Sequence, residues 1–175
     1  MEKNKALLTI SGFTLIERVV RNLEPYFGEI LISAQNPALF DFLPYKIITD
    51  EQPGQGPVMG ILSGLRASAN EVNFVTGCDI PDIDVSFLER MIAYTSGYDV
   101  VVPVSGEDKY EPLFAFYNKS VIRCIDQLLA RGHRKIIKLF PMCRTKYISF
   151  ENSGWYRNLN TMADYRAYVE KTNND

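Results

Sequence analysis

The segment that decides the fold is Val72–Pro81, which reads VNFVTGCDIP. Its first five residues, 72–76, are mostly apolar and predict a short buried strand. The residues that follow end this strand and place the carboxylate of Asp79 at its carboxyl end. In an open α/β sheet, ligands bind in the crevice outside the strand ends, where an aspartate can hold a hard cation such as Mg2+. The alternative is that Asp79 only begins the turn before Pro81, because aspartate is a common turn residue.

The composition is that of a globular protein. The chain has 175 residues, of which 46% are apolar and 23% are charged. This length fits one domain of ordinary size, so we expect residues 1–175 to share a single core. A net charge of −2 provides no basic excess, and nucleic acid is therefore not an expected partner.

The sequence carries no pattern of a membrane or secreted protein. No apolar run approaches the roughly 20 residues of a membrane-spanning helix, and Met1–Lys5 lacks the apolar core of a signal peptide behind it. We therefore expect a cytoplasmic protein. Cys78, Cys124 and Cys143 are odd in number and not closely spaced, which predicts three free thiols rather than disulfides or a zinc site.

Helical and strand patterns alternate along the chain. Apolar residues recur at helical spacing after Thr14, after Pro57 and from Val121 to a stop near Gly132. Short apolar runs predict strands at 30–32, 47–48, 72–76, 100–104, 110–117 and 147–150. This alternation predicts a three-layer α/β domain, in which helices cover both faces of a mostly parallel sheet.

Two further helices begin with capping-box patterns. Ser86 followed by Glu89 predicts one start, and Thr161 followed by Asp164 predicts the start of the closing helix. The apolar face expected for the first of these helices consists of Phe87, Leu88, Met91 and Ile92.

Polar and glycine-rich segments follow two of the expected strands. Ser33 ends the strand at 30–32, and Asp50 follows the strand at 47–48. The loop from Asp50 to Pro57 contains two glycines and two prolines before a helix, which can bring backbone N–H groups close to a ligand. Pro57 at the first helical position fits an ordinary helix start equally well.

A basic cluster lies beside Gly132. It consists of Arg131, His133, Arg134 and Lys135. Cations near a helix end are favoured by the helix dipole, which explains the cluster without a ligand. The alternative is contact with an anionic substrate, for which Arg134 is the candidate. His133 is the only histidine, so a histidine-based triad or a multi-histidine metal site is excluded.

Six segments, in the correct order, resemble the nucleotidyltransferase family that includes molybdenum cofactor guanylyltransferase. They are Asn4–Leu8 with Gly12, Leu15 and Ile16; Ile32–Gln35; Asp50 with Gly56, Pro57 and Gly60; Gly77–Pro81; the strand segment Glu111–Leu113; and Asn158–Thr161. The resemblance covers nearly the whole chain. It implies a Rossmann-like nucleotidyltransferase fold, GTP and molybdopterin as substrates, and Mg2+ as the cofactor.

The resemblance also implies a role for particular residues. Lys5 and Asp79 are the catalytic candidates, with Lys5 on the nucleotide phosphates and Asp79 on Mg2+. The residues implied for guanosine are Ser33, Asp50, Gly56 and Gly60, and those for the pterin substrate are Glu111, Arg134, Asn158 and Asn160. Without the resemblance, Lys5 is an ordinary solvated lysine and the two asparagines are caps of the final helix. Ser33 stands where the guanylyltransferases more often have asparagine.

The chain departs from the family at its beginning. The family starts with an apolar strand and a Leu-Ala-Gly-Gly loop, followed by Arg-Met-Gly, and Met1 falls at the methionine of that triplet. We therefore expect the sequence to start about 20 residues late, so that the first strand of the fold is missing.

The implied reaction is transfer of GMP from GTP to molybdopterin with release of pyrophosphate, in molybdenum cofactor biosynthesis. Molybdoenzymes or other proteins of cofactor biosynthesis are the candidate protein partners. Two alternatives stay open: a non-catalytic nucleotide-binding protein that lacks the phosphate loop, and a related nucleotidyltransferase that uses CTP or a sugar phosphate acceptor. Pyrophosphate release across a panel of nucleoside triphosphates separates them.

Overall fold

The fold is described from a computed structural model, which describes residues 4–105, 109–150 and 155–172. The chain divides into two compact units. Unit 1 comprises residues 1–28, 76–85 and 152–175, and unit 2 comprises residues 29–75 and 86–151. Both are assembled from separate segments of the chain, so this division does not decide between one domain and two, and the single domain stays a prediction.

Unit 2 contains two sheets built from the predicted strands. The larger has the order β5-β7-β6-β8, in which β6 is parallel to β8 and antiparallel to β7. The smaller is a parallel pair of β3 and β4. The strands are β3 (Leu31–Ser33), β4 (Lys46–Ile48), β5 (Val72–Thr76), β6 (Val100–Val104), β7 (Phe114–Asn118) and β8 (Thr145–Ser149). The segment Val72–Thr76 is thus a strand with the predicted bounds.

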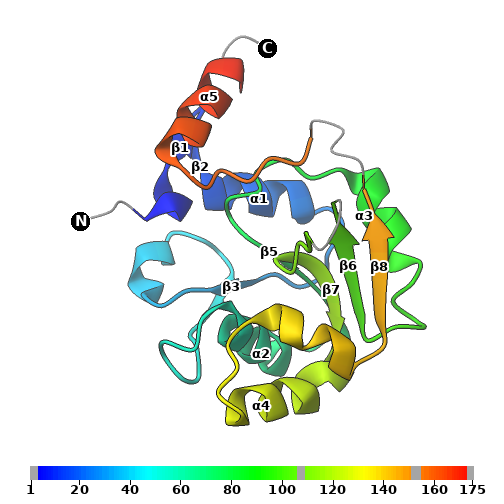
Figure 1. Cartoon of the computed structure of the whole chain (residues 1–175). Coiled ribbons are helices and arrows are strands. Elements are labelled where there is room, and N and C mark those ends of the chain that lie inside the picture. Colours follow the sequence, from blue (N-terminus) through cyan, green and yellow to red (C-terminus); the bar gives the residue numbers. More distant parts are fainter. Residues whose placement is uncertain (1–3, 106–108, 151–154, 173–175) are drawn as a thin grey trace. The chain divides into compact units, whose positions relative to one another are not determined.

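Helices cover both faces of the larger sheet (Figure 1). On one face, Val100 and Tyr117 join the core formed with α2 (Pro57–Ala67) and α4 (Ile122–Ala130). Side chains alternate along a strand, so Phe114 points to the other face, where its ring centroid lies 6.4 Å from that of Phe87 in α3 (Val85–Ile92). This arrangement confirms the predicted three-layer α/β architecture.

The chain leaves α4 at the predicted glycine. Gly132 has a φ of 75°, its N–H donates to the carbonyl of Leu129 at 2.8 Å, and the N–H of His133 donates to Leu128 at 3.1 Å. These two bonds form a Schellman motif, which satisfies carbonyls at the end of the helix and favours glycine at the positive φ. Short 3-10 helices follow at η4 (Ile136–Lys138) and η5 (Phe140–Met142).

Two local predictions for α3 are wrong. The helix begins at Val85, so Ser86 lies inside its first turn rather than at its cap. Ile92 is 52% exposed instead of lying on the apolar face. Ile92 is the last residue of the helix and stays exposed although Leu88, one turn earlier on the same side, is buried, so the apolar face does not extend to the helix end.

The strand predicted for residues 110–117 is only half correct. β7 begins at Phe114, and Tyr110 contributes a single bridge to Val104. Between them lies a turn closed by the N–H of Phe114, which donates to the carbonyl of Glu111 at 3.0 Å. Pro112 lies within this turn and has no N–H for a strand ladder, which explains the interruption.

The described part of unit 1 contains a hairpin, two α-helices and a short 3-10 helix. Ser11 and Gly12 both have positive φ, at 48° and 86°, which is the geometry of a tight hairpin turn. Apolar residues Ile10, Leu15, Leu159 and Tyr168 form the core of this unit. Thr161 and Asp164 exchange the hydrogen bonds of the predicted capping box. The elements are η1 (Lys5–Leu7), β1 (Thr9–Ile10), β2 (Phe13–Thr14), α1 (Leu15–Leu23) and α5 (Met162–Thr172).

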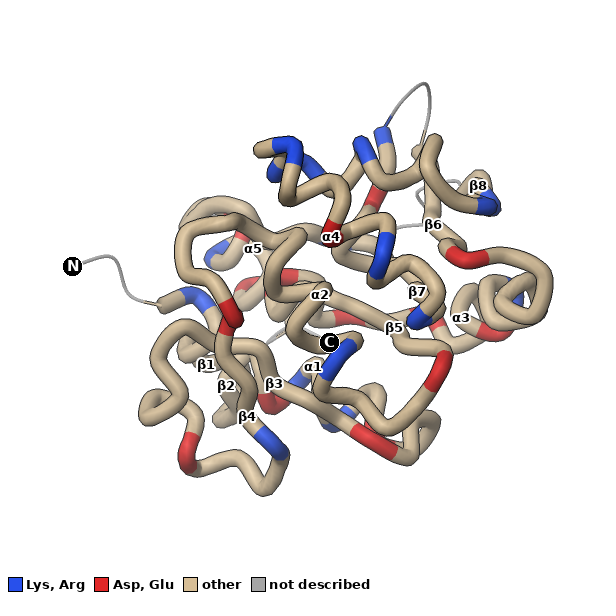
Figure 2. The backbone as a smooth tube through the Cα atoms, turned by 90° about the horizontal axis from the view of Figure 1, so that it is seen from below, with Lys and Arg blue, Asp and Glu red and all other residues tan. Residues whose placement is uncertain are grey.

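Charged residues of both signs are distributed along the described chain. Lysine and arginine segments are interspersed with acidic ones along the backbone in Figure 2. Within the described ranges, no helix combines the length and the apolar character needed to cross a membrane. Cys78, Cys124 and Cys143 are free thiols, as predicted.

Candidate active site

The loop after β5 holds Asp79 in a defined conformation. A Cβ atom on residue 77 would clash with Asp79 Oδ1, so this conformation of the carboxylate requires glycine at residue 77. The carbonyl of Asp79 accepts a hydrogen bond from the N–H of Leu159 at 2.8 Å. On the other side, Asn22 Nδ2 of α1 donates to the carbonyl of Pro81 at 2.9 Å. The loop is therefore fixed by residues of α1 and by the segment before α5.

The structure brings Lys5, Asp79, Asn158 and Asn160 close together within unit 1. Lys5 Nζ donates to the carbonyl of Asn160, and Leu159, between the two asparagines, binds Asp79. Burial raises the pKa of Cys78 to about 11, the charge of Asp79 raises it further, and the charge of Lys5 has a smaller, opposite effect. The charged groups of Lys5 and Asp79 thus act on the same thiol.

Asn158 carries an unsatisfied acceptor. Its Oδ1 is buried and has no hydrogen-bond partner among the described residues. A buried carbonyl oxygen without a partner costs about 1–3 kcal/mol, so such atoms commonly mark a place where a ligand or water donates a bond. The alternative that Asn158 caps the final helix is not supported by this oxygen, because the side chain of Thr161 caps α5.

The donor set around Asp79 fits a metal that is shared with a substrate. Within the ranges that the structure describes, no group of three His, Cys, Asp or Glu side chains could hold a metal by itself. Mg2+ in nucleotide enzymes needs only one or two carboxylates, because substrate phosphates and water supply the remaining oxygens. A single carboxylate such as Asp79 is therefore compatible with a metal shared in this way.

A second cluster in unit 2 joins Ser33, Asp50 and Gly60. A Cβ atom on Gly60 would lie 3.4 Å from Ser33 Oγ and 3.5 Å from Asp50 Oδ1. Ser33 ends β3, Asp50 follows β4, and Gly60 lies in the first turn of α2, so three elements supply the cluster. Burial raises the pKa of Asp50 above its usual value. The arrangement offers a hydroxyl and a carboxylate around a small gap that a side chain at residue 60 would fill.

The loop before α2 is bound by the basic segment after α4. Gly56 precedes the helix with a φ of 73°, a conformation that favours glycine. Arg134 Nε donates to Gln55 Oε1 at 3.0 Å. The sequence placed Arg134 among the substrate candidates but did not indicate Gln55, because nothing in the sequence pairs residues this far apart.

Glu111 does not lie on a strand, contrary to the prediction. Its N–H donates to the carbonyl of Pro103 at 3.1 Å, and its own carbonyl accepts from Phe114 in the turn before β7. Pro112 is the cause, as described above. The contacts of Ser33, Asp50 and Gly60 described above do not include Glu111.

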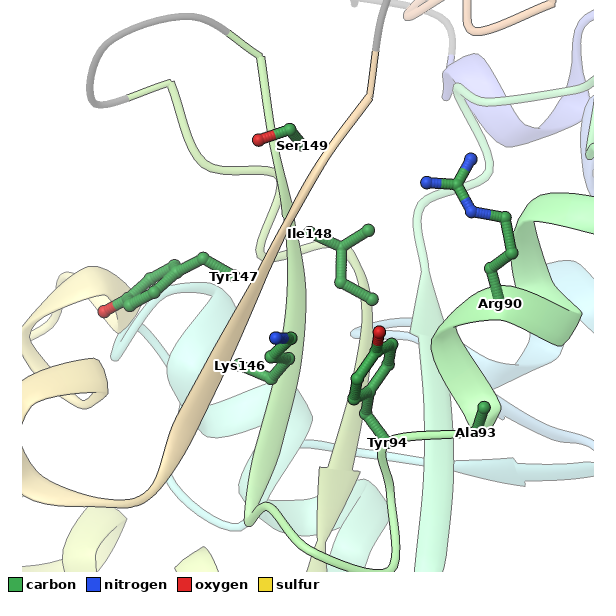
Figure 3. Close-up of a pocket in the computed structure, with 7 residues that line it drawn as sticks. All are labelled: Arg90, Ala93, Tyr94, Lys146, Tyr147, Ile148 and Ser149. Carbon is green, nitrogen blue, oxygen red and sulfur yellow. The ribbon is translucent and has the colours of Figure 1, made fainter.

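A pocket in unit 2 lies between α3 and the edge strand β8 (Figure 3). Lys146 Nζ lies 4.6 Å from the centre of the Tyr94 ring, and Tyr147 points to the opposite side of β8 from Ile148. The lining residues are Arg90, Ala93, Tyr94, Lys146, Tyr147, Ile148 and Ser149. None of the predicted site residues lines it.

Comparison with known proteins identifies the chain as a nucleotidyltransferase. The family model described as MobA-like NTP transferase domain matches residues 1–146. A probable molybdenum cofactor guanylyltransferase of Carboxydothermus hydrogenoformans is 36% identical over 97% of this chain and 89% of its own length. The molybdenum cofactor guanylyltransferase of Vibrio vulnificus is 38% identical over 91% of this chain and 83% of its own. The chain therefore belongs to the MobA-like NTP transferase family, the group that the sequence resembles.

Solved structures agree on the fold. Molybdopterin-guanine dinucleotide biosynthesis protein A from Archaeoglobus fulgidus superposes with a TM-score of 0.82 at 23% identity, covering 98% of this chain and 91% of that one. A 2-C-methyl-D-erythritol 4-phosphate cytidylyltransferase from Thermus thermophilus gives a TM-score of 0.73 at 13% identity, covering 97% and 94%. At these identities the likeness shows the fold alone.

Proposed function

We propose that the chain transfers GMP from GTP to molybdopterin and releases pyrophosphate, as a step of molybdenum cofactor biosynthesis. Relatives with this activity in their names, 36% and 38% identical over most of the chain, are the observation that carries the proposal. The cytidylyltransferases share the fold at much lower identity. GTP is therefore favoured over CTP.

Asp79 and Lys5 would act on the phosphates. Mg2+, when bound, would neutralise charge on the reacting phosphate oxygens. Asp79 would hold that ion, in the conformation that Gly77 permits. Lys5 would place its ammonium against the same anionic groups, close to where its Nζ now meets Asn160. Phosphoryl transfer depends mainly on such positioning and charge neutralisation, which is the role we assign to these two side chains.

The remaining predicted residues would bind the two substrates. We assign the guanosine to Ser33, Asp50, Gly56 and Gly60, and the pterin substrate to Arg134, Asn158, Asn160 and Glu111. The assignment to Asn158 is supported by its unpartnered buried Oδ1, which needs a donor such as a pterin N–H. Gly60 is supported by its closeness to Ser33 and Asp50. Glu111 has the weakest support, because it lies in a turn rather than on a strand.

The test measures transfer of label from α-labelled GTP to molybdopterin as a function of Mg2+ concentration. Asp79→Asn should abolish Mg2+-dependent transfer, while exposed Asp41, changed to Asn, should leave it unchanged. Full activity of the Asp79→Asn protein would refute the metal role. Nucleotide binding without pyrophosphate release in the parent would show a non-catalytic protein, and release from CTP but not GTP would show a cytidylyltransferase.

We further propose that the reaction takes place in the cytoplasm and that molybdoenzymes or other proteins of cofactor biosynthesis receive the product. Affinity capture of the parent protein, followed by a direct binding assay with each purified candidate, tests this part of the proposal.

A further inference from the structure

A network of three side chains meets at Asp82, three residues after Asp79. The hydroxyl of Tyr168 in α5 donates to Asp82 Oδ1 at 2.6 Å. Arg18 Nη2 of α1 lies 3.7 Å from the same oxygen, and the Arg18 guanidinium lies 5.6 Å from the centre of the Tyr168 ring. All three residues belong to unit 1. One carboxylate thus ties two helices to the loop after β5.

The network runs from the core of unit 1 to a partly exposed carboxylate. Tyr168 is 4% exposed and belongs to the core of unit 1 with Ile10, Leu15 and Leu159, whereas the side chains of Arg18 and Asp82 are 28% and 35% exposed. Asp82 is the acceptor of the Tyr168 hydroxyl. A hydrogen bond from a buried hydroxyl to a carboxylate is among the stronger ones in proteins, because its acceptor is charged.

The loop after β5 also forms hydrogen bonds or ion pairs with residues of α1 and of the segment before α5 at other positions. Arg18 and Asn22 are four residues apart, so they lie on one face of α1, and they reach Asp82 and Pro81 respectively. The N–H of Leu159 holds the carbonyl of Asp79. The loop of residues 77–82 is thus fixed at three positions, 79, 81 and 82.

We infer that Tyr168 is a positioning residue: its bond to Asp82 fixes the loop that carries Asp79 and so sets where that carboxylate meets the metal. The inference rests on the proposed metal role of Asp79. Neither Tyr168 nor Asp82 needs to touch a substrate in this scheme. It also explains why a tyrosine rather than phenylalanine stands at a core position, since only the hydroxyl reaches the loop.

The chain offers a matched control on the same helix. Tyr165 lies three residues earlier in α5, and its hydroxyl donates to the carbonyl of Thr9 at 2.5 Å. Tyr165→Phe therefore removes one hydroxyl bond between α5 and another part of unit 1 without touching the loop. Any general loosening of α5 should appear in both variants.

The experiment compares the full-length parent with Tyr168→Phe, Tyr165→Phe and Asp79→Asn. Hydrogen exchange reports the loop amides at 77–85, and electron paramagnetic resonance reports binding of Mn2+, used as the Mg2+ probe, in the presence of GTP. For Tyr168→Phe we expect faster hydrogen exchange of the loop amides. We also expect the Mn2+ dissociation constant to rise about three- to tenfold, which corresponds to part of the free energy of a hydrogen bond to a charged group. Tyr165→Phe should stay within about twofold of the parent, since its bond does not reach the loop.

Parent-like loop exchange and Mn2+ affinity in folded Tyr168→Phe would overturn the inference, as would an equal change in Tyr165→Phe. Asp79→Asn separates the two proposals: if it binds Mn2+ as the parent does, the metal role fails, while the exchange data still decide whether Tyr168 fixes the loop. If Tyr168→Phe does not fold, Asp82→Ala takes its place. That variant removes the acceptor of the same hydrogen bond and should loosen the same amides, and unchanged exchange would count against the inference.

Discussion

The carboxylate of Asp79 folds back over Gly77, so that Oδ1 occupies the space that any side chain on residue 77 would need. Gly77 is not among the glycines with positive φ, so its backbone conformation is open to alanine. Glycine is therefore favoured at residue 77 for steric reasons, because a larger side chain would clash with the carboxylate of Asp79, the proposed metal ligand.

Gly77→Ala should lower GMP transfer by about tenfold or more, because small displacements of a reacting group carry large losses of rate. The fold should survive, since the backbone accepts alanine and the carboxylate can rotate away. Circular dichroism and thermal unfolding check the fold, and the label-transfer assay checks the activity. Gly28→Ala is the control, because a Cβ there meets nothing within 4 Å. Equal activity of the two variants would contradict the proposed role of Asp79.

Gly60→Ala should raise the KM for GTP with a smaller effect on kcat. The added methyl group would lie against Ser33 Oγ and Asp50 Oδ1, in the gap assigned to guanosine. Stability should not fall, because alanine is favoured over glycine in a helix by about 1 kcal/mol. Gly64→Ala, one turn later, meets only Ile48 at 3.9 Å and provides the control. An unchanged KM in Gly60→Ala would remove Ser33, Asp50 and Gly60 from the nucleotide site.

The affinity for GTP should depend on pH through Asp50. Burial raises the pKa of this carboxyl group, so its neutral form persists to a higher pH than in a solvated aspartate. If the ionised carboxylate accepts hydrogen bonds from the nucleoside, the KM for GTP should fall as the pH rises through that raised pKa. Asp50→Asn should lose this dependence, and Asp41→Asn should keep it. Identical pH profiles for the parent and Asp50→Asn would show that this carboxylate does not bind GTP.

The predictable parts of the fold are those in which the local pattern and the tertiary environment agree. The bounds of Val72–Thr76 were predicted correctly, but the strand is only partly buried along its length, because β5 lies at the edge of its sheet. The strand predicted from Tyr110 fails at Pro112, whose missing N–H outweighs the apolar pattern around it. Ser86 fails as a cap because α3 begins one residue earlier.

The candidate site also has residues that could be predicted from the sequence and residues that could not. Asp79 and Asp50 stand out in the sequence because each follows a strand, and the family resemblance supplied Lys5 and the late asparagines. The contact between Tyr168 and Asp82 joins residues 86 positions apart, and neither residue type signals it. The effect of Gly77 on Asp79 is also invisible in the sequence, since it depends on the direction in which a side chain turns.

The ionised carboxylate of Asp99 should stabilise the fold against acid. Asp99 Oδ1 accepts hydrogen bonds from Ser120 Oγ at 2.8 Å and Arg144 Nη2 at 3.1 Å, and Oδ2 accepts from the backbone N–H of Arg144 at 2.9 Å. Hydrogen bonds lower the pKa of Asp99 to about 2. The side-chain bond to Arg144 has the largest effect and the bond to Ser120 a smaller one, and together the bonds outweigh burial, which raises the pKa. A lowered pKa means that the folded state favours the ionised form. The stabilisation is therefore complete above the unfolded value near 4 and is lost as the pH falls from about 4 to about 2.

Asp99→Asn should accordingly lower the free energy of unfolding at neutral pH by about 1–3 kcal/mol, the range for hydrogen bonds to a charged group. The difference from the parent should shrink as the pH falls below about 4, because the parent carboxylate then takes up a proton. Urea unfolding at a series of pH values measures this. Asp126→Asn removes the negative charge of an exposed ion pair with Arg66 and should change the free energy of unfolding by less than about 1 kcal/mol. A constant difference between the parent and Asp99→Asn from about pH 7 to about pH 2.5 would show that the ionised form of Asp99 is not what stabilises the fold, because the loss would then be independent of its charge.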